Sequence, residues 1–279
     1  MEKYQEIERT IIKTYRAHLW APFIKALKEF QLLKKDDKVC VCISGGKDSI
    51  LLAKLFQELK RHSDFEFEVK YLVMNPGYNA KNLKKIKDNL SLLHIDATII
   101  DTDIFEIANA QIKNPCYLCA KMRRGALYNL AKQLGCNKIA LGHHFDDVIE
   151  TTLMNMLNSG SFQTMLPKLH SENFEGMELI RPMYFIRERD IVRWVNYNEL
   201  SFINCACKFT ENIDHEKDLT GSKRADTKKL IKELLKYNPL VEKNIFKAAF
   251  NVNMDKILGY KHQNEYINFL DHYDKTESK

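Results

Sequence analysis

Six consecutive residues, Ser44-Gly45-Gly46-Lys47-Asp48-Ser49, have the composition of a loop that binds phosphate. They follow a β-type run and precede an apolar-periodic helical segment. Glycines allow a sharp turn, and the N–H groups that begin a helix attract anions with the help of the helix dipole. Ser44 and Ser49 add hydroxyl donors, and Lys47 adds positive charge. An ordinary Gly-rich turn is the alternative, and the string lacks the Gly-x-x-x-x-Gly-Lys-Ser/Thr spacing of a Walker loop.

A second polar string also lies where a predicted strand ends and a helix begins. It contains Gly142, His143, His144, Asp146 and Asp147. One of the two aspartates could cap the helix, which would be a purely structural role. The two histidines could be a zinc pair, but side chains of adjacent residues rarely point at the same metal. A site for a ligand at this strand end is the other interpretation.

Two thiols, Cys116 and Cys119, lie three residues apart where we expect a helix to start. This spacing puts both on one face of the helix. The helix dipole and the nearby Arg123 and Arg124 favour the thiolate form, which is the form that soft metals bind. Two half-buried structural cysteines and a redox dithiol are the alternatives.

A third thiol would favour a metal centre over those alternatives, and Cys205 and Cys207 are the candidates. Three cysteines suit a [4Fe-4S] cluster with one open iron site, whereas four would suit structural zinc. The single residue between these two cysteines is short for a zinc site. Cys40 and Cys42 alternate with valines in a strand-like run, so we assign them to the core, and Cys136 is interpreted as structural.

Strands alternate with helices over the region that carries these motifs, which predicts a parallel sheet covered on both faces. Ligands bind such sheets beyond the carboxyl ends of the strands. The predicted strands are residues 38–43, 67–74, 97–100 and 138–141. The predicted helices are residues 5–33 with a break or kink at Pro22, 49–60, 80–93, 121–133, 146–157 and 186–200, then a basic helical segment over 223–249 interrupted at Pro239. Residues 159–178 are expected to be polar and rich in loops.

Length and composition set the remaining bounds. The chain has 279 residues, of which 45% are hydrophobic, enough for a substantial core. The net charge is +6, from 43 Lys and Arg against 37 Asp and Glu, which is compatible with nucleic-acid binding but does not establish it. No apolar run is long enough to span a membrane, and the first residues lack a signal peptide's apolar core. We therefore expect a cytoplasmic protein that does not bind membranes.

These motifs together resemble the tRNA 2-thiocytidine synthetase family of the PP-loop ATP pyrophosphatases. The matching features are the phosphate loop, Cys116 and Cys119 followed by Arg123-Arg124-Gly125, the Gly142–Asp147 string, a later cysteine, and the segments Met165–Leu169 and Ile180–Met183. The resemblance covers residues 20–210 or so. It implies an α/β fold with a doubly wound parallel sheet of the adenine-nucleotide alpha-hydrolase type, flanked by helical additions at both ends.

The resemblance also implies ligands and residue roles. ATP would bind through Ser44, Gly45, Gly46, Lys47, Asp48, Ser49, Gly142, His143 and Asp147. Asp48 would help to hold Mg²⁺, which prefers oxygen ligands. A [4Fe-4S] cluster would be bound by Cys116, Cys119 and Cys205, with Cys207 as the alternative third ligand, because Asn204-Cys205-Ala206-Cys207 departs from the family's Pro-Cys-x-x-Cys string. Asp48 and Cys205 are the expected catalytic residues.

The implied function is ATP-dependent thiolation of tRNA, at C2 of a cytidine in the anticodon loop, through an adenylated intermediate. A PP-loop enzyme for another nucleoside or a small molecule, and a non-catalytic sensor of ATP and a cluster, are the alternatives. The expected partners are tRNA, a sulfur donor such as a cysteine desulfurase, and a second copy of the chain in a homodimer. We expect a helical segment over residues 1–35, the catalytic domain over 36–210 and a basic helical segment over 211–279. Candidate contacts to tRNA are Arg123, Arg124, Lys223, Arg224, Lys228, Lys229, Lys232 and Lys236.

Overall fold

The computed structural model describes residues 2–109, 115–203, 223–263 and 265–273, with the backbone alone for residues 109 and 115–117. The chain divides into two compact units, Met1–Lys229 and Leu230–Lys279. No helix among the described residues is both long enough and apolar enough to cross a membrane.

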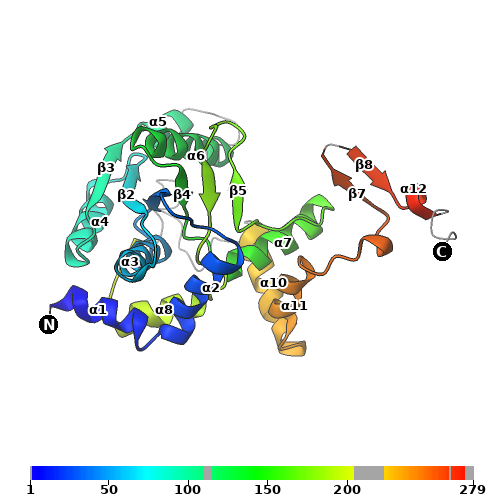
Figure 1. Ribbon diagram of the computed structural model, residues 1–279, viewed down its shortest axis with the longest axis horizontal. Coiled ribbons are helices and arrows are strands. Elements are labelled where there is room, and N and C mark those ends of the chain that lie inside the picture. Colours follow the sequence, from blue (N-terminus) through cyan, green and yellow to red (C-terminus); the bar gives the residue numbers. More distant parts are fainter. Residues whose placement is uncertain (1, 110–114, 204–222, 264, 274–279) are drawn as a thin grey trace. The chain divides into compact units, whose positions relative to one another are not determined.

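The first unit is built on one six-stranded sheet in the order β3-β2-β1-β4-β6-β5, in which only β5 runs antiparallel to its neighbour (Figure 1). The strands are β1 (Lys38–Ile43), β2 (Glu68–Asn75), β3 (Ala97–Asp101), β4 (Lys138–Ala140), β5 (Lys168–His170) and β6 (Glu178–Ile180). The prediction of a mainly parallel α/β sheet is therefore confirmed. Residues 159–178 are mostly loop, as predicted, although β5 and the first residue of β6 also lie there.

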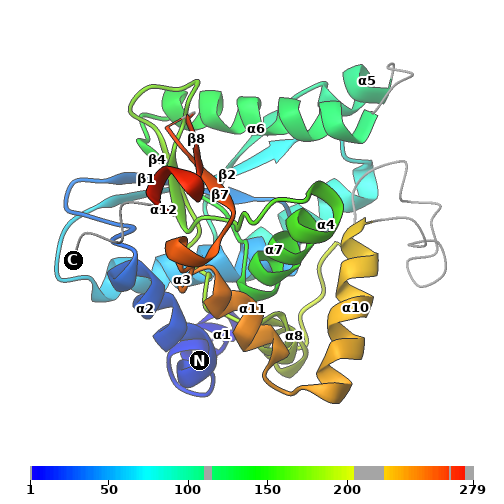
Figure 2. The ribbon, with the colours of Figure 1, turned by 90° about the vertical axis from the view of Figure 1, so that its right-hand side faces the viewer.

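Helices cover both faces of this sheet, with α6 on one side of the strands and α3 on the other (Figure 2). On the α6 side, Tyr128 and Ala131 pack in one cluster with Cys40, Cys42 and Cys136, so the assignment of these three cysteines to the core is confirmed. The helices of the sheet region are α3 (Lys47–His62), α4 (Ala80–Leu92), α5 (Ile104–Asn109), α6 (Pro115–Gln133), α7 (Phe145–Ser159) and α8 (Glu188–Tyr197).

The N-terminal region is three short helical pieces, so the prediction of one helix interrupted at Pro22 was wrong. The pieces are α1 (Lys3–Ile12), a π-helical turn η1 (Arg16–Trp20) and α2 (Ala21–Glu29). Pro22 lies in the first turn of α2, where the N–H that proline lacks needs no helical partner. The break comes earlier, where the Tyr15 N–H donates to the Thr10 carbonyl at 2.7 Å and widens the turn.

Helix α10 (Lys223–Tyr237) begins in the first unit, and the second unit continues with α11 (Val241–Ala248). The two helices are separated around Pro239, as predicted. A short 3-10 turn (Met254–Lys256), a hairpin of β7 (Gly259–His262) and β8 (Glu265–Asn268), and α12 (Leu270–Tyr273) follow. The hairpin was not predicted.

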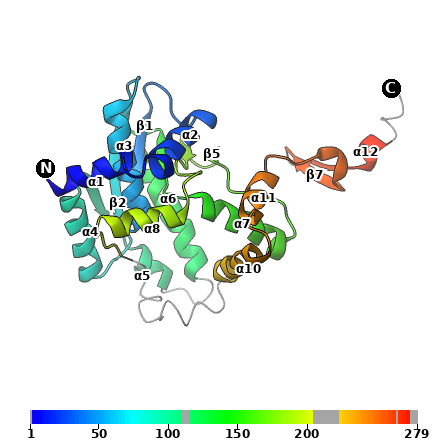
Figure 3. The same cartoon turned by 90° about the horizontal axis from the view of Figure 1, so that it is seen from below.

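Helix α1 contacts α3, the helix that the phosphate loop precedes (Figure 3), and a buried ion network joins the two. The Lys54 ammonium has no solvent exposure, and it contacts Glu8 Oε1 at 2.5 Å, Gln57 Oε1 at 2.6 Å and the Leu93 carbonyl at 2.9 Å. Arg61 contacts the other oxygen of Glu8 at 2.7 Å. Burial raises the pKa of Glu8, but Arg61 and Lys54 outweigh this and leave the pKa below its ordinary value.

Glu8→Ala is expected to lower the free energy of unfolding by about 3–5 kcal/mol, because it leaves the buried Lys54 ammonium without a counter-ion. Urea denaturation of the full chain measures this. Glu6→Ala, on the same helix but exposed, is the control and should change stability by about 0.5 kcal/mol at most. Equal losses in the two variants would contradict a role for the buried pair.

Candidate functional site

The phosphate loop joins β1 to α3 in a backbone conformation that needs glycine. Gly45 has φ +84°, and a Cβ atom there would lie 2.6 Å from Ile86 Cγ1 and 2.9 Å from Ile203 Cδ1. Gly46 caps α3 in an extended conformation. A side chain at Gly45 would therefore meet both backbone strain and a clash.

The two serines of the loop are bonded to each other across its ends. The Ser49 hydroxyl donates to the Gly46 carbonyl at 2.9 Å and accepts from the Ser44 N–H at 3.1 Å. The two hydroxyl oxygens lie 3.2 Å apart. The Tyr78 hydroxyl donates to the Ser44 carbonyl at 3.2 Å. These bonds hold the loop as a compact turn at the N-terminus of α3.

The second polar string reaches the phosphate loop because β4, which it follows, pairs with β1 in the sheet. A Cβ atom on Gly142 would lie 3.0 Å from the Asp48 carbonyl carbon and 3.1 Å from the Ser49 nitrogen. The two strings, about a hundred residues apart in sequence, are therefore in backbone contact.

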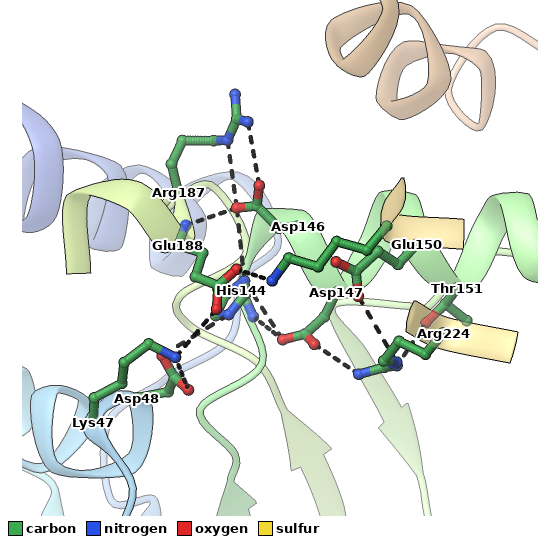
Figure 4. Close-up of polar contacts among 11 residues, drawn as sticks. Lys47, Asp48, His144, Asp146, Asp147, Glu150, Thr151, Arg187, Glu188 and Arg224 are labelled. Carbon is green, nitrogen blue, oxygen red and sulfur yellow. Dashed lines mark hydrogen bonds and ion pairs between the residues drawn. The ribbon is translucent and has the colours of Figure 1, made fainter. Parts of the chain in front are cut away.

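The two aspartates of the second string have different tasks. His144 is the N-cap residue of α7, and its N–H donates to Asp147 Oδ2 at 3.0 Å. Asp146 instead accepts the Glu188 N–H at 2.7 Å and pairs with the Arg187 guanidinium at 3.2 Å (Figure 4). Asp147 thus supports the start of α7, whereas Asp146 binds the start of α8.

A cavity of about 310 Å³ brings most of the predicted nucleotide-site residues together. It is lined by Cys42, Ile43, Ser44, Asp48, Ser49, Met74, Arg123, Leu127, Leu141, Gly142, His143 and Asp147. A larger hollow of about 610 Å³ lies among the N-terminal helices and the end of α3, but it is lined by none of the predicted site residues. Chemistry therefore favours the smaller cavity, which combines hydroxyl, carboxylate, imidazole and guanidinium groups with an apolar wall.

Two of these polar side chains have a buried atom that makes no hydrogen bond within the described part of the chain. They are Asp48, through Oδ1, and His143, through Nδ1. Burial lowers the pKa of His143 to about 4, against the opposing charge of Asp147, so this imidazole is neutral at neutral pH. Buried polar atoms without a partner are costly, and a ligand or cation can satisfy them. The carboxylate oxygen suits Mg²⁺, and the donors of the loop suit phosphate.

Lys47 does not turn into this cavity. Its ammonium lies 3.1 Å from Asp48 Oδ2 and 3.3 Å from Glu188 Oε1 (Figure 4). Glu188 also contacts Lys228 at 2.5 Å, and Arg224 contacts Asp147 at 2.9 Å. Sequence patterns gave no sign of Glu188, because it contacts the loop across 141 positions. Of the cations proposed to contact tRNA, these two of α10 are paired with acidic groups of the site, and Lys236 is paired with Glu233 on its own helix.

The predicted cluster ligands are only partly within the described residues. Cys119 is half-buried on α6, of Cys116 only the backbone is described, and Cys205 and Cys207 lie outside the described residues. Within the described residues, no three His, Cys, Asp or Glu side chains are grouped so as to hold a metal ion. A hydrogen bond to Cys40 and burial raise the pKa of Cys136, as expected of an unreactive core thiol.

The chain matches known proteins over most of its length. The PP-loop domain, an ATP-binding family, matches residues 19–213. A tRNA-cytidine(32) 2-sulfurtransferase of Geobacter sulfurreducens is 32% identical over 86% of this chain and 91% of the relative. One of Coxiella burnetii (strain RSA 493) is 33% identical over 85% of this chain and 90% of the relative. This chain therefore belongs to the PP-loop family and, within it, to the family of the tRNA-cytidine(32) 2-sulfurtransferases.

A solved structure shares the fold. The U34-tRNA thiolase NcsA from Methanococcus maripaludis, determined with its [4Fe-4S] cluster, is 22% identical and superposes with a TM-score of 0.64. The match covers 82% of this chain and 76% of that one.

Gly142→Ala is expected to weaken ATP binding at least tenfold while the chain stays folded, because the added Cβ would press on the first turn of α3 at 3.0–3.1 Å. Isothermal titration calorimetry measures the affinity, and circular dichroism checks the fold. Gly125→Ala on α6 is the matched control, since its Cβ would meet nothing within 4 Å and alanine favours a helix. Equal affinity in both variants would show that the loop tolerates the contact.

Proposed function

We propose that this protein is an ATP-dependent tRNA sulfurtransferase that replaces the oxygen at C2 of a cytidine in the anticodon loop by sulfur. The observation that carries the proposal is the cavity in which the phosphate loop meets Gly142, His143 and Asp147. The activity named for the relatives supports the substrate, because they are similar to this chain along most of both sequences.

The chemistry requires that the carbonyl oxygen become a leaving group. That oxygen attacks the α-phosphorus of ATP, a new P–O bond forms, and the bond to the β-phosphate breaks, which releases pyrophosphate. A sulfide equivalent then adds to C2, and AMP departs with the original oxygen. The sulfur comes from a donor such as a cysteine desulfurase, and because its persulfide must gain two electrons to yield sulfide, a dithiol or another two-electron reductant is a further reactant.

Each part of the cavity has a proposed task in the first step. Ser44, Gly45, Gly46 and Ser49 would bind the pyrophosphate end of ATP through N–H and hydroxyl donors. Gly142, His143 and Asp147 would face the nucleotide, and a neutral His143 avoids repelling the cation that accompanies ATP. Asp48 would hold Mg²⁺, which when bound neutralises charge that develops on the leaving pyrophosphate. Lys47 is proposed to act through Asp48, which its ammonium contacts.

The second step needs a sulfur carrier near the same cavity. Cys119 lies on α6 four residues before Arg123, which lines the cavity, and residues four apart share a helix face. We propose that Cys116, Cys119 and Cys205 hold a [4Fe-4S] cluster, with Cys207 as the alternative third ligand and Cys205 as the ligand on which catalysis depends. When bound, a cluster with an open iron supplies a place for the incoming sulfur. A homodimer and a cytoplasmic location remain predictions.

Asp48→Asn is expected to lower the rate of pyrophosphate release on adding tRNA by about 100-fold or more, because it removes the charge proposed to hold the cation. A coupled pyrophosphate assay measures this. Asp64→Asn, exposed beyond the other end of α3, is the control and should match the wild-type protein.

Nucleoside mass spectrometry of tRNA from a deletion strain tests the substrate, with 2-thiocytidine as the product that should disappear. Pyrophosphate release without any lost thionucleoside would indicate another substrate. ATP binding without tRNA-dependent pyrophosphate release would favour a sensor.

Cys119→Ala and Cys116→Ala are each expected to remove the broad iron–sulfur absorption of the anaerobically purified protein, whereas the core variant Cys136→Ala should keep it. Cys205→Ala should lose both the cluster and thiolation, and Cys207→Ala should largely keep the cluster. Iron and sulfide counts accompany the spectra. Stoichiometric zinc without iron would contradict the presence of a cluster. Loss of the cluster in both the Cys205→Ala and the Cys207→Ala variant would mean that four protein ligands hold it.

A further inference from the structure

Four side chains of alternating charge form a row that ends at the phosphate loop, and Figure 4 labels the three nearest the loop, Glu188, Lys47 and Asp48. Lys228 of α10 lies 2.5 Å from Glu188 Oε2, and Glu188 Oε1 of α8 lies 3.3 Å from the Lys47 ammonium. Lys47 lies in turn 3.1 Å from Asp48 Oδ2. The row therefore connects three helices, α10, α8 and α3, through direct ion pairs.

The row fixes one oxygen of Asp48 and leaves the other one without a hydrogen bond. Oδ2 is paired with Lys47, whereas Oδ1 is buried and has no hydrogen-bond partner, and the His144 Nε2 atom lies 3.9 Å from it. Asp48 also lines the nucleotide cavity. A carboxylate that is held by one oxygen keeps its orientation, which is how outer groups prepare a ligand for a metal.

All members of the row that show a pKa shift are held in their charged form. Burial raises the pKa of Glu188, but Lys228 and Lys47 outweigh it and bring the pKa to about 2. Burial lowers the pKa of Lys47 and of Lys228, and the neighbouring carboxylates outweigh it in both cases. The exposed fractions of the Glu188 and Lys47 side chains are only 26% and 28%, so water screens their contact incompletely.

Glu188 is itself fixed from the backbone side. It is the first residue of α8, and its N–H donates to Asp146 of the second polar string. An acidic residue in the first turn of a helix also stabilises the helix dipole, which would be a purely structural reason for this glutamate. Asp190 lies in the same first turn, but it contacts His18 and Arg193 and not the loop. Both acids can stabilise the helix dipole, but Glu188 alone of the two contacts Lys47 of the loop, so a comparison of Glu188 and Asp190 variants distinguishes the structural role from a role at the loop.

We propose that Glu188, backed by Lys228, is a positioning residue for Mg²⁺-dependent binding of ATP. It holds the Lys47 ammonium on one oxygen of Asp48, so that the other oxygen is available to the cation. This inference rests on the proposed function, because it assigns a task to residues around the same ATP site. Without Glu188, Lys47 is free to cover both oxygens of Asp48 or to leave them.

The test measures the dissociation constant of ATP for the full-length protein by calorimetry, with Mg²⁺ and without it. The decisive quantity is the ratio of the two constants, because a change that weakens ATP binding equally with and without Mg²⁺ cancels in it, and Asp190→Asn controls for the loss of one negative charge from the same helix turn. Glu188→Gln should reduce the Mg²⁺-dependent gain about tenfold or more, the scale found for groups that orient metal ligands. Asp190→Asn should leave the ratio as in the wild-type protein.

Lys228→Gln should reduce the ratio in the same direction but by less, since its side chain is 45% exposed and lies one step further from Asp48. It also carries the test if Glu188→Gln does not fold, as judged by circular dichroism and thermal melting. An unchanged ratio in folded Glu188→Gln, or an equal reduction in Asp190→Asn, overturns the positioning role. If the wild-type protein binds no ATP, the proposed function fails with it; if it binds ATP without any gain from Mg²⁺, only the positioning role fails.

Discussion

The approach of Gly142 to the peptide between Asp48 and Ser49 is the contact on which the site depends. A Cβ atom on Gly142 would lie only 3.0 Å from the Asp48 carbonyl carbon, so any other residue in the turn after β4 would push the phosphate loop aside. The contact exists because Val41 and Ala140 are paired in the sheet, and this register places the turn that follows β4 beside the last residues of β1. Two loops distant in sequence thereby become one wall of one cavity, as expected at the carboxyl edge of a parallel sheet.

The acidic groups around this wall connect it to the helices that follow. Asp146 binds the N-terminus of α8, and Asp147 receives Arg224 from α10. Burial raises the pKa of Glu150, the next acid on α7, although Lys228 and Arg224 oppose it. Carboxylates whose only role was to bind the nucleotide or its cation would not need to be paired with arginines, as Asp146 and Asp147 are. The arrangement indicates that the start of α10 is part of the site's electrostatic surroundings, in addition to any contact with tRNA.

Patterns in the sequence predicted the features that depend on residues close to one another along the chain. The glycines of the phosphate loop, the alternation of strands and helices, and the burial of Cys40 and Cys42 all follow from short-range spacing. The strands β5 and β6 escaped prediction because each has only three residues and lies in or beside a polar, loop-rich stretch, whereas the equally short β4 follows a helix in the regular alternation. The direction of the Lys47 side chain could not be predicted for a different reason. Its second partner, Glu188, is distant in sequence and is brought to it by the packing of α8, not by a local motif.

Helix α6 carries residues assigned to both steps of the proposed reaction, Arg123 at the cavity for adenylation and Cys119 for sulfur delivery. It begins at Pro115, where the two thiols predicted a helix start, so Cys116 and Cys119 belong to the same helix as Arg123. Arg123 lines the cavity where adenylation would take place, and Cys119 lies one helical turn before it. An activated base loses its AMP to water unless sulfur arrives within the same enclosed space. Cys119, one helical turn from the cavity wall on α6, therefore lies where the proposed second step needs a sulfur carrier.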